Sequence, residues 1–216
     1  MAVNSSTDIC NLALDLLSAD TVQDIENPTS ATESILNRWY DQSRKKLLRE
    51  HPWNFAIKRV ILAANSTRPA FGYSASFSIP SDFVRLLSLS SDLSVNKETL
   101  LPKDSYQFEN NKILLNDYYG DVTSLRLIYV SNNVTVSQFD PMFIDLLAHE
   151  IALSVAYKIT ETNTNVERIQ SLYRARSMMA KAIDGQERPP SRIERSRALS
   201  ARRRAGATHR NDRVIF

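Results

Sequence analysis

The spacing of the apolar residues changes twice along this chain, and that change is the strongest constraint on its fold. Residues 4–51 and 140–185 carry apolar side chains at helical spacing. Residues 71–131 instead carry short β-branched and aromatic runs separated by turn residues. Two helices on each side of a β-rich stretch predict an α+β fold, in which a four-helix bundle holds an inserted small antiparallel β-sheet domain.

Capping residues and prolines predict where the first two helices begin and end. The first covers residues 4–19, and one of three side chains is expected to cap it: Ser6, Thr7 or Asp8. The second begins after Pro28, because Ser30 and Glu33 fit a capping box, and it stops before Pro52. Its basic residues predict a solvated face in preference to a nucleic-acid site: Arg38, Arg44, Lys45, Lys46 and Arg49.

The β-rich stretch is read as five strands. They are predicted at residues 71–79, 84–90, 99–101, 112–116 and 124–131. Just before this stretch, Trp53 and Phe55 stand two apart on an extended segment and therefore project to the same side. We expect these two aromatic side chains to fix the helices to the β domain.

The last two helices follow residue 131. Asp140 and Pro141 suit the cap and the first position of a third helix. Apolar residues cover most of its circumference, which is typical of a central helix. A capping box at residues 164–167 begins a fourth helix, and Gly185 is placed to end it. The apolar residues expected to face the core in this fourth helix are Ile169, Leu172, Tyr173, Met179 and Ile183.

The chain is therefore divided into three parts. Residues 1–65 and 132–185 form the discontinuous helical bundle, residues 66–131 the inserted β domain, and residues 186–216 an extended basic C-terminal arm. The arm has nine arginines and three acids, a formal charge of +6 in a chain of net charge +3. With few apolar residues it needs a partner to become ordered. It is interpreted as an arm that grips a neighbour, a nucleic-acid tether or a solvated terminus.

Motifs for catalysis and metal binding do not fit. One cysteine, Cys10, excludes an internal disulfide and a cysteine-based zinc site. The His149-Glu150 pair lacks the second histidine of a zinc-protease helix, since position 153 is leucine. We expect a partly buried polar pair there, no enzyme activity, no metal and no cofactor. No apolar run is long enough to span a membrane, and no secretory signal is expected at the N-terminus.

Several fragments, taken in their order along the chain, resemble the tail tubular protein A family. Its members are the head–tail adaptors of short-tailed bacteriophages (podoviruses). The resemblance covers about residues 5–190. The fragments are Ala13-Leu14-Asp15-Leu16-Leu17, Pro52-Trp53-Asn54-Phe55-Ala56, Ile79-Pro80-Ser81-Asp82-Phe83 with Arg85-Leu86-Leu87, Asn111-Lys112-Ile113-Leu114, Phe139-Asp140-Pro141-Met142-Phe143 and Asp184-Gly185-Gln186-Glu187.

The resemblance implies a structural virion protein, assembled in the host cytoplasm and placed at the head–tail junction. Its implied partners are copies of itself in a twelve-membered ring, the portal protein and the tail nozzle protein, with double-stranded DNA passing through and no membrane contact. The portal-binding residues would be Arg188, Arg192, Arg195, Arg197, Arg202, Arg203, Arg204, Arg210, Arg213 and Phe216. The loop expected to meet the nozzle contains Tyr118, Tyr119, Gly120 and Asp121.

Two other functions remain open at this point. The arginine-rich tail alone is compatible with a nucleic-acid-binding protein, whose affinity for DNA falls steeply with salt. An enzyme whose site is assembled in space from distant residues is the third reading.

Overall fold

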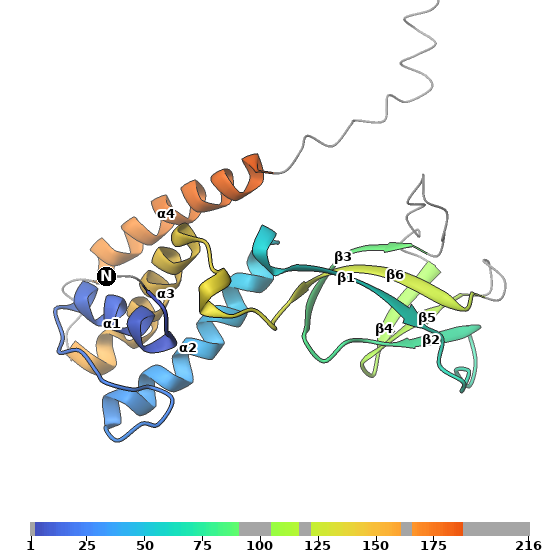
Figure 1. Ribbon diagram of the computed structural model, residues 1–216, viewed down its shortest axis with the longest axis horizontal. Coiled ribbons are helices and arrows are strands. Elements are labelled where there is room, and N and C mark those ends of the chain that lie inside the picture. The colour runs from blue at the N-terminus through green and yellow to red at the C-terminus, as the bar shows by residue number, and fades with distance from the viewer. Residues whose placement is uncertain (1–2, 91–104, 117–121, 161–165, 188–216) are drawn as a thin grey trace, which may run out of the picture. The chain divides into compact units, whose positions relative to one another are not determined.

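The computed structural model describes residues 3–90, 105–116, 122–160 and 166–187. Within these residues the fold is mixed α and β, with four helices and two small antiparallel sheets, as the α+β prediction requires (Figure 1). The chain divides into two compact units, residues 1–184 and 185–216. The elements are α1 (Ser6–Leu17), α2 (Ala31–Glu50), β1 (Ile57–Ala63), β2 (Ala75–Ser78), β3 (Phe83–Ser90), β4 (Tyr106–Glu109), β5 (Lys112–Leu115), β6 (Ser124–Ser131), α3 (Pro141–Thr160) and α4 (Val166–Gln186).

Helices α1 and α2 both begin with a capping box. In α2 the predicted pair forms, and backbone N–H groups of Thr29 and Ser30 lower the pKa of Glu33 to about 2. In α1 the predicted cap was wrong by one position. Ser5 is the cap, because an acid stands three residues after it: the Asp8 amide donates to Ser5 Oγ over 3.1 Å, and the Asp8 carboxylate accepts from the Ser5 amide.

Helix α3 packs against both α1 and α2. It starts as predicted, since Asp140 Oδ1 accepts the Met142 N–H over 2.7 Å. Buried residues occur all round it, which explains its lack of a polar face. The helical core is defined here as the buried cluster built around α3. Its members include Ile9, Leu14, Leu36, Leu47, Leu48, Trp53, Phe143 and Ile151.

Helix α4 adds Ile169 and Ala180 to this core. Two details of its prediction were wrong. Met179 is 57% exposed, because the buried stripe runs through Ser177, Ala180 and Asp184 instead. Gly185 does not end the helix, which continues to residue 186; helix ends placed from sequence commonly move by one or two residues.

The strands form two three-stranded sheets, with orders β1-β6-β3 and β2-β5-β4, where one small sheet was expected. Strand β1 pairs with β6 along its whole length, from Ile57 opposite Val130 to Ala63 opposite Ser124. The prediction had included β1 in the helical residues 1–65, and it had also missed β4. Strand β4 has only four residues, and β1 follows the Trp53 turn without a break. The strand predicted at residues 99–101 lies outside the described residues.

A second core joins the two sheets. Along β6 the side chains of Leu125, Leu127 and Tyr129 enter this β core, together with Phe77 of β2 and Ile113 of β5. Val130, on the opposite face of β6, belongs to the helical core. Strand β6 therefore contributes to both cores. Figure 1 shows that β1 follows the end of α2 and runs beside β6.

Asp82 fastens the turn before β3 to the neighbouring strands. Its carboxylate accepts hydrogen bonds from Ser131 Oγ at 2.7 Å, Tyr129 Oη at 2.9 Å and Lys58 Nζ at 3.0 Å. Partial burial alone would raise the pKa of this carboxyl. The three donors outweigh burial and hold its pKa below the usual 3.8.

Replacing Asp82 by Asn is expected to lower the free energy of unfolding by about 2 kcal/mol at neutral pH, because charge-assisted hydrogen bonds are lost. The folded-state pKa of Asp82 is depressed, so its contribution is complete above about pH 4 and is lost as the pH falls through the folded value below 3.8. Denaturant unfolding of both proteins between pH 7 and pH 2 measures this. A stability difference that stays constant down to pH 2 would contradict the assignment.

Candidate functional site

The residues predicted to bind partners all lie outside the described residues. This holds for the nozzle loop of Tyr118, Tyr119, Gly120 and Asp121. It also holds for the portal-binding set of the arm: Arg188, Arg192, Arg195, Arg197, Arg202, Arg203, Arg204, Arg210, Arg213 and Phe216. Their roles stay predictions. The described residues contain two other arrangements of polar and charged groups, a junction around Asp184 and a hollow on the sheet β1-β6-β3.

The junction is built on the buried carboxylate of Asp184, near the end of α4. Asp184 Oδ1 accepts the backbone N–H of Asn54 over 2.8 Å, and Oδ2 lies 2.8 Å from His51 Nε2. The Asn54 side chain donates in turn to the Asp184 backbone carbonyl over 2.8 Å. Residues 130 positions apart are thereby joined at the turn that links α2 to β1.

Aromatic rings pack around this turn. Trp53 meets Phe143 edge to face with ring centroids 5.1 Å apart, and Phe143 also contacts Phe55 and Phe139 at 5.0 and 4.9 Å. The Trp53 indole donates to the Leu47 carbonyl, so its buried N–H is satisfied. Trp53 and Phe55 therefore pack at the helical core, and their expected role in fixing the helices to the β domain stays a prediction. The extended segment predicted for them is wrong, because residues 54–56 form a 3-10 turn.

Arginines fasten the end of α2 to β3. Arg85 Nη1 donates to the carbonyls of Arg49 and Glu50, two of the acceptors left over at a helix C-terminus. Arg49 Nη1 donates back to the Val84 carbonyl over 2.8 Å. On the same helix Arg44 is largely buried and donates to the Asn132 carbonyl, so the prediction of a solvated basic face is wrong for Arg44.

The remaining members of that predicted basic face are more exposed. Lys45 pairs with Asp41 over 2.6 Å, and Lys46 pairs with Glu150 of α3 over 2.6 Å, while half of each lysine side chain is exposed. Arg38 is exposed. The basic residues of α2 are therefore divided between structural contacts and solvent and do not form one uniform patch.

His149 and Glu150 are both buried, where a partly buried polar pair was expected. His149 Nδ1 donates to the Asp145 carbonyl over 2.8 Å, and Nε2 has no hydrogen-bond partner among the described residues. The described residues hold no group of three or more His, Cys, Asp or Glu side chains able to bind a metal ion. Burial raises the pKa of the Cys10 thiol to about 12, so it is not a reactive thiolate near neutral pH.

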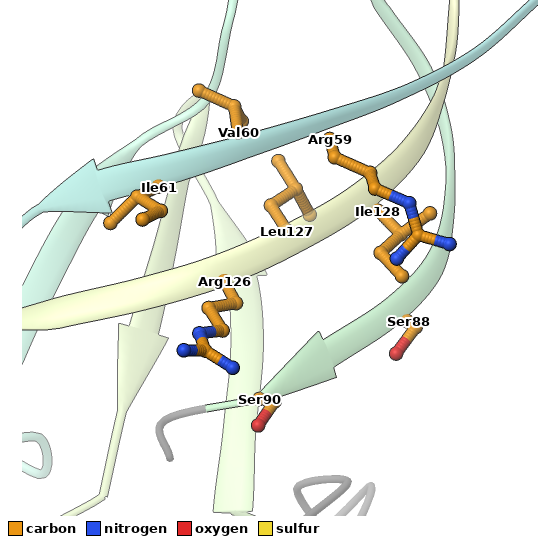
Figure 2. Close-up of a pocket in the computed structure, with 8 residues that line it drawn as sticks. All are labelled: Arg59, Val60, Ile61, Ser88, Ser90, Arg126, Leu127 and Ile128. Atoms are coloured by element: carbon orange, nitrogen blue, oxygen red, sulfur yellow. The ribbon is translucent and has the colours of Figure 1, made fainter. Parts of the chain in front are cut away.

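The hollow lies on the outer face of the sheet β1-β6-β3 and has a volume of about 340 Å³. Figure 2 shows the residues that line it: Arg59, Val60 and Ile61 of β1, Arg126, Leu127 and Ile128 of β6, and Ser88 and Ser90 of β3.

Guanidinium and hydroxyl groups line this hollow, and Arg59, Arg126 and Ser90 each already take part in an interaction within the chain. These residues were not predicted as a site, although the sequence of β6 contains a signal. Leu125, Leu127 and Tyr129 alternate with Arg126 and Ile128, which indicates a strand with one apolar buried face and one more polar face.

The chain matches no protein-family model, and no curated protein matches it in sequence. Among the helices of the described residues, none is both long and apolar enough to cross a membrane.

Replacing Asp184 by Ala is expected to lower the free energy of unfolding by about 3 kcal/mol, because buried donors of Asn54 and His51 lose their acceptor. Asp15→Ala, at an exposed position of α1, is the matched control and should change stability by less than about 0.5 kcal/mol. Urea unfolding at pH 7 measures both. Equal stabilities of the two variants would show that the Asp184 contacts do not hold the junction.

Proposed function

We propose that the protein is a structural head-to-tail adaptor of a podovirus virion, without catalytic activity or cofactor. It assembles in the host cytoplasm and forms a ring of twelve copies between the portal and the tail nozzle. Double-stranded DNA passes through this ring during ejection. The proposal includes the finer architecture expected from the sequence, a four-helix bundle with an inserted β domain and an extended C-terminal arm.

The observation that carries this proposal is that the fragments resembling the family contact one another in the structure. Residues 52–56, 139–143 and 184–187 are far apart in the chain, yet Trp53 contacts Phe143 and Asn54 binds Asp184. The fragment at residues 79–83 contributes Asp82, which fastens the strands. The resemblance therefore falls on the residues that set how helices connect to strands, which is the property an adaptor needs if it is to hold two partners at a fixed spacing.

In this proposal the arm, residues 186–216, grips the portal. Its nine arginines offer planar forks for carboxylates, so acidic grooves on portal subunits are the expected receptors. Twelve linked arms gain avidity even when each contact is weak. The loop at residues 118–121 is assigned to the nozzle.

Deleting residues 186–216 is expected to leave a folded protein that no longer joins portal particles. Electron microscopy and co-sedimentation with purified portal measure docking, and thermal unfolding checks the fold. A variant whose arm has the same composition in shuffled order shows whether docking to the portal depends on the sequence of the arm or only on its charge. Normal docking by the truncated protein would show that the arm is not the portal contact.

A nucleic-acid-binding role is the second candidate, favoured by the charge of +6 in the arm. In that case the full chain binds duplex DNA with log affinity falling by about 0.9 per phosphate contact for each tenfold rise in salt. DNA binding of this kind, lost with the arm and accompanied by no portal docking, would replace the adaptor proposal. Absence of DNA binding at low salt would dispose of this candidate.

A further inference from the structure

We propose that copies of this chain associate with one another by packing α1 of one copy on the outer face of α4 of the next. The outer face of α4 is defined here by five exposed residues: Arg174, Ala175, Met178, Met179 and Ala182. This contact supplies the association between copies that the proposed adaptor ring requires. The closed ring therefore rests on the adaptor proposal, whereas the contact itself can be tested on the isolated protein.

The outer face of α4 has an apolar centre that nothing in the described residues covers. Met178 is 71% exposed and Met179 is 57% exposed. Ala175 and Ala182 lie one turn before and one turn after Met178, and both are exposed. Single exposed apolar residues are ordinary on a protein surface. Here two flexible thioethers adjoin small side chains, which makes a contiguous surface on which a second helix can pack closely.

Arginines border this apolar centre. Arg168 and Arg174 are exposed on α4, and Glu167 is the exposed acid beside them. Arg176 and Lys181 instead pair with acids of α3 and α2, so their charges are directed back to the body of the protein. Two arginines and one glutamate leave this side of α4 with a formal charge of +1.

Helix α1 presents the opposite charge around an exposed apolar residue. Leu12 is 37% exposed, and Asp15 is exposed almost one turn further along the same helix. Asp20, just beyond the end of α1, is exposed as well. The first lysine or arginine of the chain is Arg38, so no basic residue of the preceding segment offsets these acids. The surface of α1 is therefore complementary in charge to the outer face of α4.

These charges decide which faces can meet. Leu12 and Met178 are both exposed in the single chain, so α1 and α4 do not cover each other within one copy. Packing α4 on α4 would bring arginines together, and packing α1 on α1 would bring acids together; both are unfavourable. The contact of α1 with α4 joins two different surfaces. Such a heterologous contact repeats from copy to copy and forms a ring when its rotation closes.

Methyl NMR of the full-length protein, labelled at methionine and leucine, tests the contact from micromolar to millimolar concentration. The signals of Leu12, Met178 and Met179 should shift together as the concentration rises and should give one dissociation constant. The signals of Leu48, which is fully buried, should stay in place. Sedimentation of the same samples should show that oligomers grow over the same range of concentration.

Reversing single charges tests which faces meet. Asp15→Lys and Arg174→Glu should each weaken self-association at least about tenfold. An equal mixture of these two variants should associate again, because the altered α1 of one variant then meets the altered α4 of the other. The controls Glu109→Lys and Arg38→Glu make the same charge changes at exposed positions of β4 and α2, and each should associate like the unaltered protein.

Three results would overturn the proposal. The first is no shift of these methyl signals at millimolar protein. The second is a shift of Leu12 without Met178 and Met179, which is expected if the basic arm binds α1 instead. The third is a mixture of the two charge variants that associates no better than either variant alone, with thermal unfolding showing both to be folded.

Docking to portal particles is measured separately, so this contact and the adaptor function can fail independently. A chain carrying Asp15→Lys that still forms rings on the portal would refute the contact and keep the adaptor proposal. Association through α1 and α4 without any portal docking would do the reverse.

Discussion

The contact of Asp184 with the turn after α2 is the constraint on which the described structure depends. A buried carboxylate is costly unless donors surround it, and here the Asn54 amide and His51 lie within 2.8 Å. This requirement fixes where α4 meets the start of β1. The aromatic rings around Trp53 then fill the space beside it with apolar surface, so polar and apolar contacts specify the same position for the turn. Asp82 repeats this arrangement among the strands, where hydroxyls and Lys58 surround it.

Strand β6 links the two cores because its successive side chains point to opposite faces of the sheet. Its odd-numbered residues 125, 127 and 129 enter the β core, and Val130 enters the helical core. Loss of either core therefore exposes residues of the same strand, and the two cores should open together. The same alternation leaves Arg126 and Ile128 on the outer face, so the hollow is a consequence of how β6 divides its side chains.

Local sequence signals predicted the parts of this fold that depend on local chemistry. The Ser30–Glu33 box and the Asp140–Pro141 start were readable because caps are made by neighbouring residues. Apolar residues on all sides of α3 predicted that it is the central helix. Strand β1 was missed because its partner β6 lies more than sixty residues further along the chain. Strand β4 has only four residues and was missed although it forms a hairpin with its neighbour β5. The junction could not be predicted from local sequence either, because Asp184 accepts its hydrogen bond from Asn54, 130 residues away in the chain. The hollow had a readable alternation in β6, but its other walls come from β1 and β3, and only the register brings them together.

Native-state hydrogen exchange tests most directly whether helices and strands form one body. The account predicts that the slowest amides of α3 and of β6 exchange through a common opening, with the same free energy and the same denaturant dependence. It also predicts that Asp184→Ala lowers both values equally. A β6 that exchanges through a separate opening of much lower free energy, unaffected by loss of Asp184, would contradict the account, because the strands would then move independently of the helices they are meant to be fixed to.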